Sequence, residues 1–191
     1  MKVDLYATHK AEYIAPKKPE FVKVGPAHYL AIEGTGAPGE PQFQESIGAL
    51  YATAYTIKMT SKFAGKDYKV CPLEGLYWGD IPKEWHWKLL IRTPDFIGRA
   101  EWKAAQQKLA AKQNPLVPQV KLEKLKEGKC VQMLHVGPYD RVGETFTVMR
   151  ERVEEEGLAL HGLHHEVYLN DPRRVKPEKL KTILRMPVGK A

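Results

Sequence analysis

The sequence predicts an α+β protein built from two similar halves, each with the element order strand, helix, strand, strand. This order is found twice along the chain, apolar residues recur at helical spacing between extended runs, and the runs alternate with a period of two. We expect a single domain over residues 1–191, with a first repeat at about 19–114, a linker at about 115–129 and a second repeat at about 130–191. Such units place helices on one face of an antiparallel sheet, so we expect a ligand groove on the opposite face, where the halves meet.

The composition is that of an ordinary globular protein, with 43% hydrophobic and 28% charged residues. No apolar run reaches the ~18 residues of a membrane span, and the first residues do not open a signal peptide, so we expect a cytoplasmic protein without a membrane partner. The net charge of +7 is scattered along the chain. Its densest run, Lys121 to Lys129, alternates with glutamates and is typical of a solvated face, so we expect no direct nucleic-acid binding.

Metal and cofactor sites are not expected. Cys71 and Cys130 have no second cysteine or histidine at metal-ligand spacing, so we interpret both as small buried hydrophobes or reduced thiols. His164 and His165 are adjacent and face opposite sides of a strand, which prevents them from sharing a metal easily. His135 stands alone and is interpreted as structural or surface-exposed, and no dinucleotide or phosphate-binding motif is present.

The first half begins with an extended run over residues 21–34 that contains Val24-Gly25-Pro26. Pro41 can start a helix, and the strand over residues 85–92 ends this half. A further helix is expected after Thr93, a good N-cap, and ends before Asn114-Pro115. Along one face of the Pro41 helix the spacing predicts Ile47, Leu50, Tyr51, Ala54 and Lys58, with Tyr55 beside this stripe.

The second half repeats this order. Residues 130–139 form an extended run that contains Val136-Gly137-Pro138, and a helix that stops near Gly157 follows. A strand over residues 182–188 ends the half. The shared Val-Gly-Pro and Tyr-x-x-Asp sequences are the anchors of the repeat, and we expect the halves to superpose. The stripe expected to be buried against the sheet is Val142, Phe146, Met149 and Val153.

Glu166 is the candidate for chemistry. In the strand-like run 164–169 it shares a face with Tyr168, while Val167 and Leu169 share the other. If the helices cover Val167 and Leu169, Glu166 and Tyr168 face the groove. A carboxylate in a partly apolar cleft can pair with a cation or act as a general base. The alternative, a solvated strand glutamate, stays open.

Aromatic residues are concentrated in one stretch of the first half. Tyr77, Trp78, Trp85 and Trp87 fall close together, and aromatic faces around an acidic group suit a flat cation. Trp85 and Trp87 share a strand face with apolar residues, so both a core and a ligand-binding role stay open for them. The repeat aligns Tyr77 with Tyr168, which directs Tyr77 to the groove and Trp78 away from it.

Several stretches in a fixed order carry a family resemblance. They are Glu33-Gly34-Thr35-Gly36-Ala37-Pro38 with the helix 43–59, the run Tyr68 to Trp78, Trp85-His86-Trp87 with Ile91-Arg92-Thr93-Pro94, His135-Val136-Gly137-Pro138-Tyr139, and the run His164 to Arg174. Together they resemble the GyrI-like small-molecule-binding superfamily over nearly the whole chain from Pro19 onward. The resemblance implies two pseudo-symmetric repeats around a central groove, as in effector-binding domains of multidrug-responsive regulators.

The resemblance also implies site residues and functions. Glu166 matches the glutamate that faces cationic ligands in many members, and some stand-alone members hydrolyse the cyclopropane ring of DNA-alkylating natural products. Tyr77 stands where tryptophan is commoner, and the residues before Pro19 are too few for a DNA-binding segment, so we do not expect direct transcriptional control. The implied catalytic residues are Glu166 and Tyr168, and the implied ligand-binding residues are Tyr77, Trp78, Trp85, Trp87, Tyr139 and Tyr55.

Three functions therefore compete. The first is a hydrolase that adds water to a flat, electrophilic xenobiotic or antibiotic, with Glu166 as general base. The second is a non-catalytic protein that sequesters or senses flat hydrophobic or cationic molecules. The third, a gyrase-inhibitor-like protein-interaction module, follows from the family name alone. The expected partner is a small-molecule ligand, no cofactor is expected, and the protein is expected to be a monomer or a homodimer.

Overall fold

The structure is a computed structural model that describes residues 2–112 and 114–191, and it confirms the α+β fold. The chain forms two compact units. The first unit contains residues 2–8, Ala27–Cys71 and Gly75–Leu125, and the second contains His9–Pro26, Pro72–Glu74 and Lys126–Ala191. Residues 9–26, which include the expected start of the first repeat at about residue 19, belong to the second unit.

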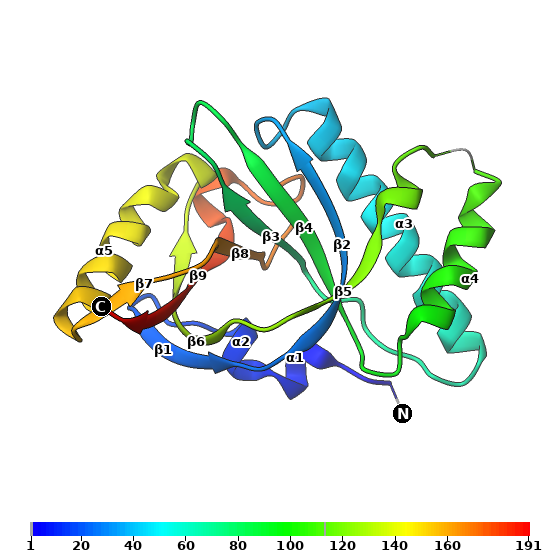
Figure 1. The fold of residues 1–191 in the computed structure, drawn as a ribbon, viewed down its shortest axis with the longest axis horizontal. Helices are drawn as coiled ribbons and strands as arrows, with labels where there is room; N and C mark the ends of the chain where they lie inside the picture. Colours follow the sequence, from blue (N-terminus) through cyan, green and yellow to red (C-terminus); the bar gives the residue numbers. More distant parts are fainter. Residues whose placement is uncertain (1, 113) are drawn as a thin grey trace. The chain divides into compact units, whose positions relative to one another are not determined.

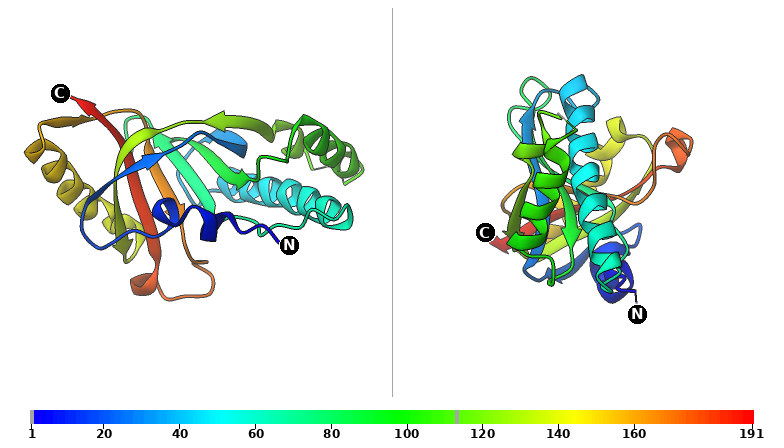
Figure 2. Two further views of the ribbon diagram at one scale, coloured as in Figure 1. Left: turned by 90° about the horizontal axis from the view of Figure 1, so that it is seen from below. Right: turned by 90° about the vertical axis from the view of Figure 1, so that its right-hand side faces the viewer.

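The first unit contains a sheet with the strand order β3-β4-β2-β5 and two main helices. Strand β2 pairs antiparallel with both β4 and β5. Helices α3 and α4 lie side by side (Figure 2), and α3 packs on β2 and β4. Its elements are α1 (Leu5–Thr8), β2 (Ala27–Thr35), α3 (Pro41–Phe63), β3 (Leu73–Trp78, whose first two residues belong to the second unit), β4 (His86–Thr93), α4 (Arg99–Ala110), η1 (Val117–Gln119) and β5 (Lys121–Leu125).

Helix α3 begins at Pro41 as predicted, but it buries a partly different face. Leu50 and Ala54 are buried as expected, whereas Ile47, Tyr51 and Lys58 are only half-buried. The face predicted from the apolar spacing is therefore only partly the buried one, because most of the buried face is made of small residues, which do not stand out in a hydrophobic pattern. The buried residues are Phe43, Ser46, Ala49, Leu50, Thr53, Ala54, Ile57 and Ser61.

Helix α4 begins later than predicted. Thr93 is the last residue of β4, and its hydroxyl donates a hydrogen bond to the carbonyl of His28 at 3.3 Å. The side chain therefore joins two strands instead of capping a helix, and α4 starts at Arg99. The carboxylate of Glu101 accepts a hydrogen bond from the N–H of Gly98 at 2.9 Å and so satisfies one donor at the start of the helix.

Part of the expected linker is a strand. Residues Lys121–Leu125 form β5, which pairs with β2 and lies at the end of the strand order in this unit. The lysines of the run are exposed as predicted. The strand was missed because an edge strand in contact with water carries many charged side chains and lacks the apolar alternation of a buried strand.

The second unit contains a sheet with the order β1-β6-β9-β8, and β7 pairs with β9. The pairs β1–β6, β6–β9 and β8–β9 are antiparallel, as predicted. Its elements are α2 (Lys10–Tyr13), β1 (Glu20–Val24), β6 (Gly128–Val136), η2 (Tyr139–Arg141), α5 (Val142–Glu155), β7 (Leu158–Leu160), β8 (His164–Tyr168), η3 (Pro177–Lys179) and β9 (Lys181–Lys190) (Figure 1).

Helix α5 packs through the predicted stripe. Met149 and Val153 are buried, and Val142 and Phe146 are half-buried against the same cluster. The cluster also contains Val131 of β6 and Leu184 of β9, and α5 contacts β6, β7 and β9. The burial of this stripe, predicted from spacings of four and three residues, is confirmed.

The repeated element order is confirmed within the two units. The series β2-α3-β3-β4 matches β6-α5-β8-β9, and in each series the first strand pairs with the fourth and the fourth with the third. The Tyr-x-x-Asp sequences start near the ends of β3 and β8, as expected. The two Val-Gly-Pro sequences do not occupy equivalent places in the two series, so this part of the prediction was wrong. Val24-Gly25-Pro26 precedes β2, whereas Val136-Gly137-Pro138 begins at the last residue of β6. A match of three residues does not show which end of a strand it occupies.

Candidate functional site

Glu166 lies on the same face of the sheet as α5. Residues directly opposite each other on antiparallel strands share a face. Glu166 lies opposite Leu184 of β9, which in turn lies opposite Met133 of β6, and both of these residues belong to the cluster that packs against α5. The register places the helix on the side of Glu166 and not on the side of Val167, which a groove-facing Glu166 would require. Glu166 and Tyr168 do share a face, as predicted.

The footprint of α5 explains how a carboxylate can lie on this face. The helix packs mainly on β6, β7 and β9, so β8 lies at the margin of the covered area. The Glu166 residue is buried, with 8% of its surface exposed, which does not fit a solvated strand glutamate. A buried carboxylate needs partners to offset the loss of water, and in this unit the nearest partner is a histidine of the same strand.

His164 is that partner. Its ring Nε2 lies 2.6 Å from Oε1 of Glu166, and its ring stacks on Phe146 of α5 with a centroid distance of 4.1 Å and an interplanar angle of 29°. Residues two apart in a strand face the same way, so the contact follows from the strand geometry. His165 points to the other face and contacts other residues, as the sequence predicts for two adjacent histidines.

Two tyrosines lie in the same part of the second unit. Tyr139 of η2 packs edge-on against Tyr168, with a centroid distance of 5.6 Å and an angle of 85°. Burial, followed by the negative charges of Glu166 and Asp171, raises the pKa of Tyr139 to about 12. The Tyr139 hydroxyl therefore stays protonated at neutral pH and remains a hydrogen-bond donor. Glu166, Tyr168 and Tyr139 are the sequence-derived site residues that the second unit brings together.

In the first unit, Tyr77 and Trp85 form a pair. Their rings pack edge-on at 6.0 Å and 87°. Leu76 and Trp78 belong to a core cluster on one face of the sheet, so Tyr77 lies on the other face. A methyl group at Gly75 would come within 2.8 Å of the Tyr77 ring, so only glycine leaves this ring in place.

The other aromatic candidates have different surroundings. Trp87 is completely buried, packs edge-on against Phe43 at 5.2 Å and covers Gly34, so it lies in the core. Trp78 stacks on His86 at 5.8 Å and is half-buried. Tyr55 is 52% exposed on α3, where it stacks on Tyr51.

Two hollows lie elsewhere in the units. One of about 350 Å³ in the first unit is lined by residues of β2, η1 and β5, among them Ala31 and Glu123. Ala31 packs in the same cluster as Leu76, so this hollow lies on the face away from Tyr77. The other, of about 150 Å³ in the second unit, is lined by residues around Gly137 and Thr145. Glu166 lines neither of these two hollows.

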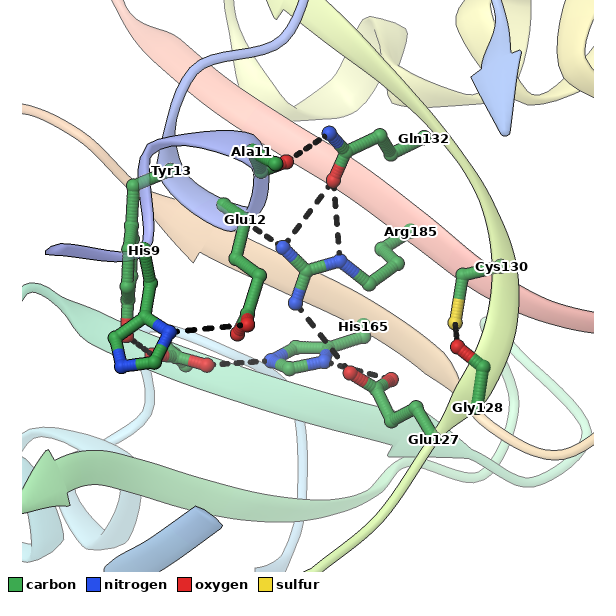
Figure 3. A network of polar contacts seen from close by, with 11 residues as sticks. His9, Ala11, Glu12, Tyr13, Glu127, Gly128, Cys130, Gln132, His165 and Arg185 are labelled. Atoms are coloured by element: carbon green, nitrogen blue, oxygen red, sulfur yellow. Dashed lines mark hydrogen bonds and ion pairs between the residues drawn. The ribbon is translucent and has the colours of Figure 1, made fainter. Parts of the chain in front are cut away.

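A row of buried polar residues crosses the opposite face of the second unit (Figure 3). Gln132 of β6, Arg185 of β9 and His165 of β8 lie opposite one another in register. His165 is fully buried between two carboxylates, with Nε2 at 2.9 Å from Glu74 and Nδ1 at 2.9 Å from Glu127. We call Glu74, Glu127, Gln132, His165 and Arg185 the buried polar row.

The row also holds the N-terminal segment of this unit. Arg185 donates to the carbonyl of Glu12, and Gln132 donates to the carbonyl of Ala11 at 2.7 Å. The hydroxyl of Tyr13 donates to Glu74 at 2.9 Å. Helix α2 has only four residues, so these side chains supply partners that its own turn cannot provide.

The charges in the row stabilise one another. Burial alone would lower the pKa of His165, but Glu127 and Glu74 outweigh this effect and raise it to about 9. Burial alone would raise the pKa of Glu127, but His165 and Arg185 outweigh this effect and lower it to about 2. His165 is therefore an imidazolium ion and Glu127 a carboxylate at neutral pH.

These shifts predict the pH dependence of stability. The stabilisation from His165 is complete below its unfolded pKa of about 6.5 and is lost as the pH rises through about 9. The stabilisation from Glu127 is complete above its unfolded pKa of about 4.5 and is lost as the pH falls through about 2. We expect the urea concentration at the midpoint of unfolding to decline between about pH 6.5 and about pH 9 in the wild type. The decline should be smaller in His165→Gln, which lacks this titrating group. An equal decline in both proteins would contradict this, and His161→Gln at an exposed position is the control.

The buried polar row was not predicted from the sequence. Glu127 lies in the lysine-rich run that was interpreted as solvated, yet its side chain is only 4% exposed. His165 precedes Glu166 and was considered only as a metal ligand. The five residues come from separate segments, and no spacing in the sequence shows that they meet. His135 was interpreted correctly as a possible structural residue: it is buried and contacts Thr145 and Pro138.

Other expected properties can be compared with the described residues. Cys71 and Cys130 are buried free thiols, as predicted, and burial raises the pKa of Cys130 to about 12. In the described part of the chain, no group of three or more histidine, cysteine, aspartate or glutamate side chains is arranged to hold a metal ion. The described helices include none with the length and apolar character needed to cross a membrane.

Comparison with known proteins identifies the family. The model of the GyrI-like small molecule binding domain matches residues 90–188, and the chain belongs to this family. A crystal structure described as a hydrolase from Listeria innocua is 38% identical, has a TM-score of 0.91 and aligns over 98% of this chain and 100% of that chain. No curated protein gave a match.

More distant structures share the fold. The EcmrR C-terminal domain is 14% identical, with a TM-score of 0.61 over 91% of this chain and 98% of that chain. SAV2435, solved with bound tetraphenylphosphonium, is 12% identical, with a TM-score of 0.50 over 90% of this chain and 94% of that chain. The protein is therefore a small-molecule-binding domain of the GyrI-like type, and similar structures include one described as a hydrolase.

Proposed function

We propose that the protein binds flat, hydrophobic electrophiles and hydrolyses the strained cyclopropane ring of DNA-alkylating xenobiotics, with Glu166 as general base. The observation that carries this proposal is the buried Glu166 carboxylate, held by His164 at 2.6 Å in a setting that includes two tyrosines. A buried carboxylate with a fixed orientation is suited to taking a proton from water. The relative described as a hydrolase supports an enzymatic function.

The reaction balances without a cofactor. Glu166 accepts a proton from water as the water oxygen forms a bond to a cyclopropane carbon. The ring carbon–carbon bond breaks, and its electron pair moves into the conjugated carbonyl of the substrate. That oxygen then takes up a proton, so the product is the substrate plus one water. Tyr139, whose pKa is about 12, can donate a hydrogen bond to this oxygen as charge develops on it.

In this proposal Tyr168 and Tyr139, in the same unit as Glu166, bind the ring system of the ligand, and the aromatic candidates of the first unit are proposed as ligand contacts within that unit. Tyr168 and Tyr139 form an edge-on pair in the second unit, and Tyr77 and Trp85 form one in the first. Trp78 and Tyr55 have part of their surface exposed and are proposed as separate ligand contacts, since Trp78 lies on the face of the sheet opposite Tyr77. Trp87 supports the set from the core, because its ring packs on Phe43 and Gly34.

The second candidate function is binding without turnover, in a cytoplasmic protein that sequesters or senses such molecules. It requires the same residues but no activated water. SAV2435, which shares the fold and was solved with bound tetraphenylphosphonium, favours it. Incubation with a cyclopropane-bearing alkylator separates the two functions: a ring-opened hydrate that forms faster than in buffer supports the hydrolase, and unchanged compound recovered in complex with the protein supports the binder.

Ligand binding itself is testable with dyes. We expect planar cationic dyes to quench tryptophan fluorescence and to bind with micromolar affinity, about 8 kcal/mol. Double-stranded DNA should bind weakly, and more weakly still at higher salt, because scattered lysines give only screened contacts. DNA binding that resists salt, together with no effect of any dye on fluorescence, would rule out the proposed function.

A further inference from the structure

Helix α3 carries a second periodic row of residues, on the face that its own chain leaves uncovered. The helix runs as one continuous element from Pro41 to Phe63 (Figure 2), and its buried face contains the residues named above. On the other face, residues follow one another at alternating spacings of three and four, and none of them is buried. They are Glu45, Gly48, Ala52, Tyr55, Met59 and Lys62, which we call the α3 seam.

The α3 seam has the pattern of a helix that packs against another helix. Alternating spacings of three and four are those of the a and d positions of a coiled coil. Tyr55 is 52% exposed and Met59 is 41% exposed, although both side chains are large and mostly apolar. Phe63 at the end of the helix is 81% exposed. A row of exposed large side chains on one helix face indicates a surface for another molecule.

The fold of a single chain does not explain the glycine in the seam. Apart from its chain neighbours and the backbone of its own helix, a Cβ atom at Gly48 would meet no described atom within 4 Å. Glycine inside a helix lowers stability relative to alanine, because it loses more backbone freedom on folding. Gly48 and Ala52 do allow a second helix to approach closely. One half of the seam therefore offers space, and the other half offers side chains that fill space.

The α3 seam is complementary to itself when a second copy of the helix runs antiparallel. If Glu45 faces Lys62 of the second copy, then Gly48 faces Met59 and Ala52 faces Tyr55, because the spacings of the seam read the same in both directions. A large side chain meets a small one in each inner layer, and opposite charges meet in each outer layer. A parallel pair would instead place Glu45 against Glu45 and Lys62 against Lys62.

We propose that the α3 seam is the interface of a homodimer in which two copies of α3 pack antiparallel, at the crossing angle of about 20° that helix bundles share. A two-fold axis relates the copies, so every contact occurs twice. This inference goes beyond the proposed function and does not depend on it. In the dimer Tyr55 contacts the second copy, so a ligand can reach this side chain only in the monomer.

Sedimentation equilibrium together with zero-length cross-linking tests the dimer and its register. The wild type should be mostly dimeric at about 100 μM protein. A carbodiimide joins a carboxylate directly to a nearby lysine amine. Glu45 and Lys62 lie about 25 Å apart along one helix, so a cross-link between them must join two copies, and we expect it in the dimer. A wild type that stays monomeric, or a dimer that does not give this cross-link, would overturn the proposal.

Exchange of the two charges tests the outer layers. Glu45→Lys and Lys62→Glu each place like charges against one another, and each should raise the dissociation constant of the dimer about tenfold, because the contact is lost twice. The double variant Glu45→Lys/Lys62→Glu exchanges the charges and should return the constant to within about threefold of the wild-type value. Single variants that dimerise like the wild type, or a double variant that does not recover, would show that the proposed register is wrong.

Gly48→Gln tests the inner layers. Glutamine is a better helix former than glycine and has room at this position in a single chain, so the monomer should stay folded. In the dimer the new side chain occupies the space of Met59, and the dissociation constant should rise at least about tenfold. Gly143→Gln, at a glycine of α5 with similar open space, is the matched control and should dimerise like the wild type.

An anionic membrane surface is the competing occupant of the seam, because aromatic side chains next to lysines also suit lipid headgroups. Flotation with phosphatidylglycerol vesicles separates the two. A protein that is monomeric in solution, and that binds these vesicles less strongly after Met59→Asp, would show that the seam binds lipid and that the dimer proposal is wrong. A dimer that does not float with the vesicles supports the proposal.

Discussion

Glu166→Gln is expected to lower the turnover of a cyclopropane-bearing substrate ~10²- to 10⁴-fold, the range typical for loss of a general base. The amide keeps the shape of the side chain and can still bond to His164, so the fold is expected to persist. It cannot accept a proton from water, so the chemical step is impaired while uncharged ligands still bind nearly as well. Steady-state rates and equilibrium titrations of the two proteins measure these effects separately.

Glu151→Gln is the matched control for this change. Glu151 lies on the exposed surface of α5 in the same unit, so this variant should turn over substrate like the wild type. If Glu166 serves only as a counter-charge, Glu166→Gln weakens cationic ligands alone. A Glu166→Gln protein that hydrolyses and binds like the wild type would mean that the carboxylate has no part in the function.

Arg185→Met is expected to destabilise the second unit by about 3 to 5 kcal/mol. Arg185 is 1% exposed and bonds to Glu127, to Gln132 and to the backbone of Glu12. Methionine has a similar length but leaves a carboxylate and a carbonyl without one of their partners in a buried setting. Urea unfolding monitored by circular dichroism measures the loss.

Arg173→Met provides the comparison at the surface. Arg173 bonds to Asp171, but its side chain is 87% exposed, so the same substitution should change the stability by less than about 1 kcal/mol. Equal urea midpoints for the two variants would show that the buried polar row contributes no more than a surface ion pair.

The sequence predicted those features that rest on local periodicity. The buried stripe of α5 follows from apolar residues at spacings of three and four, and the common face of Glu166 and Tyr168 follows from strand alternation. The start of α3 at Pro41 also depends on one residue and its fixed backbone angle. Each of these is a relation between residues close together in the chain.

Features that depend on distant residues were not predicted. The buried face of α3 carries Ser46 and Thr53. Both residues are polar on hydrophobicity scales, but they fit a close contact between the helix and the sheet. Glu127 is buried because His165 and Arg185 supply positive charge, and those residues lie far along the chain. The side of the sheet covered by α5 depends on strand register, which no local pattern contains.

The most direct test of the account is hydrolysis of a cyclopropane-bearing alkylator in isotopically labelled water, with wild type, Glu166→Gln and buffer compared by mass spectrometry. The wild type is expected to form a ring-opened product carrying one labelled oxygen, and Glu166→Gln is expected to form it at least ~10²-fold more slowly. Equal rates of product formation for the wild type, Glu166→Gln and buffer would contradict this expectation.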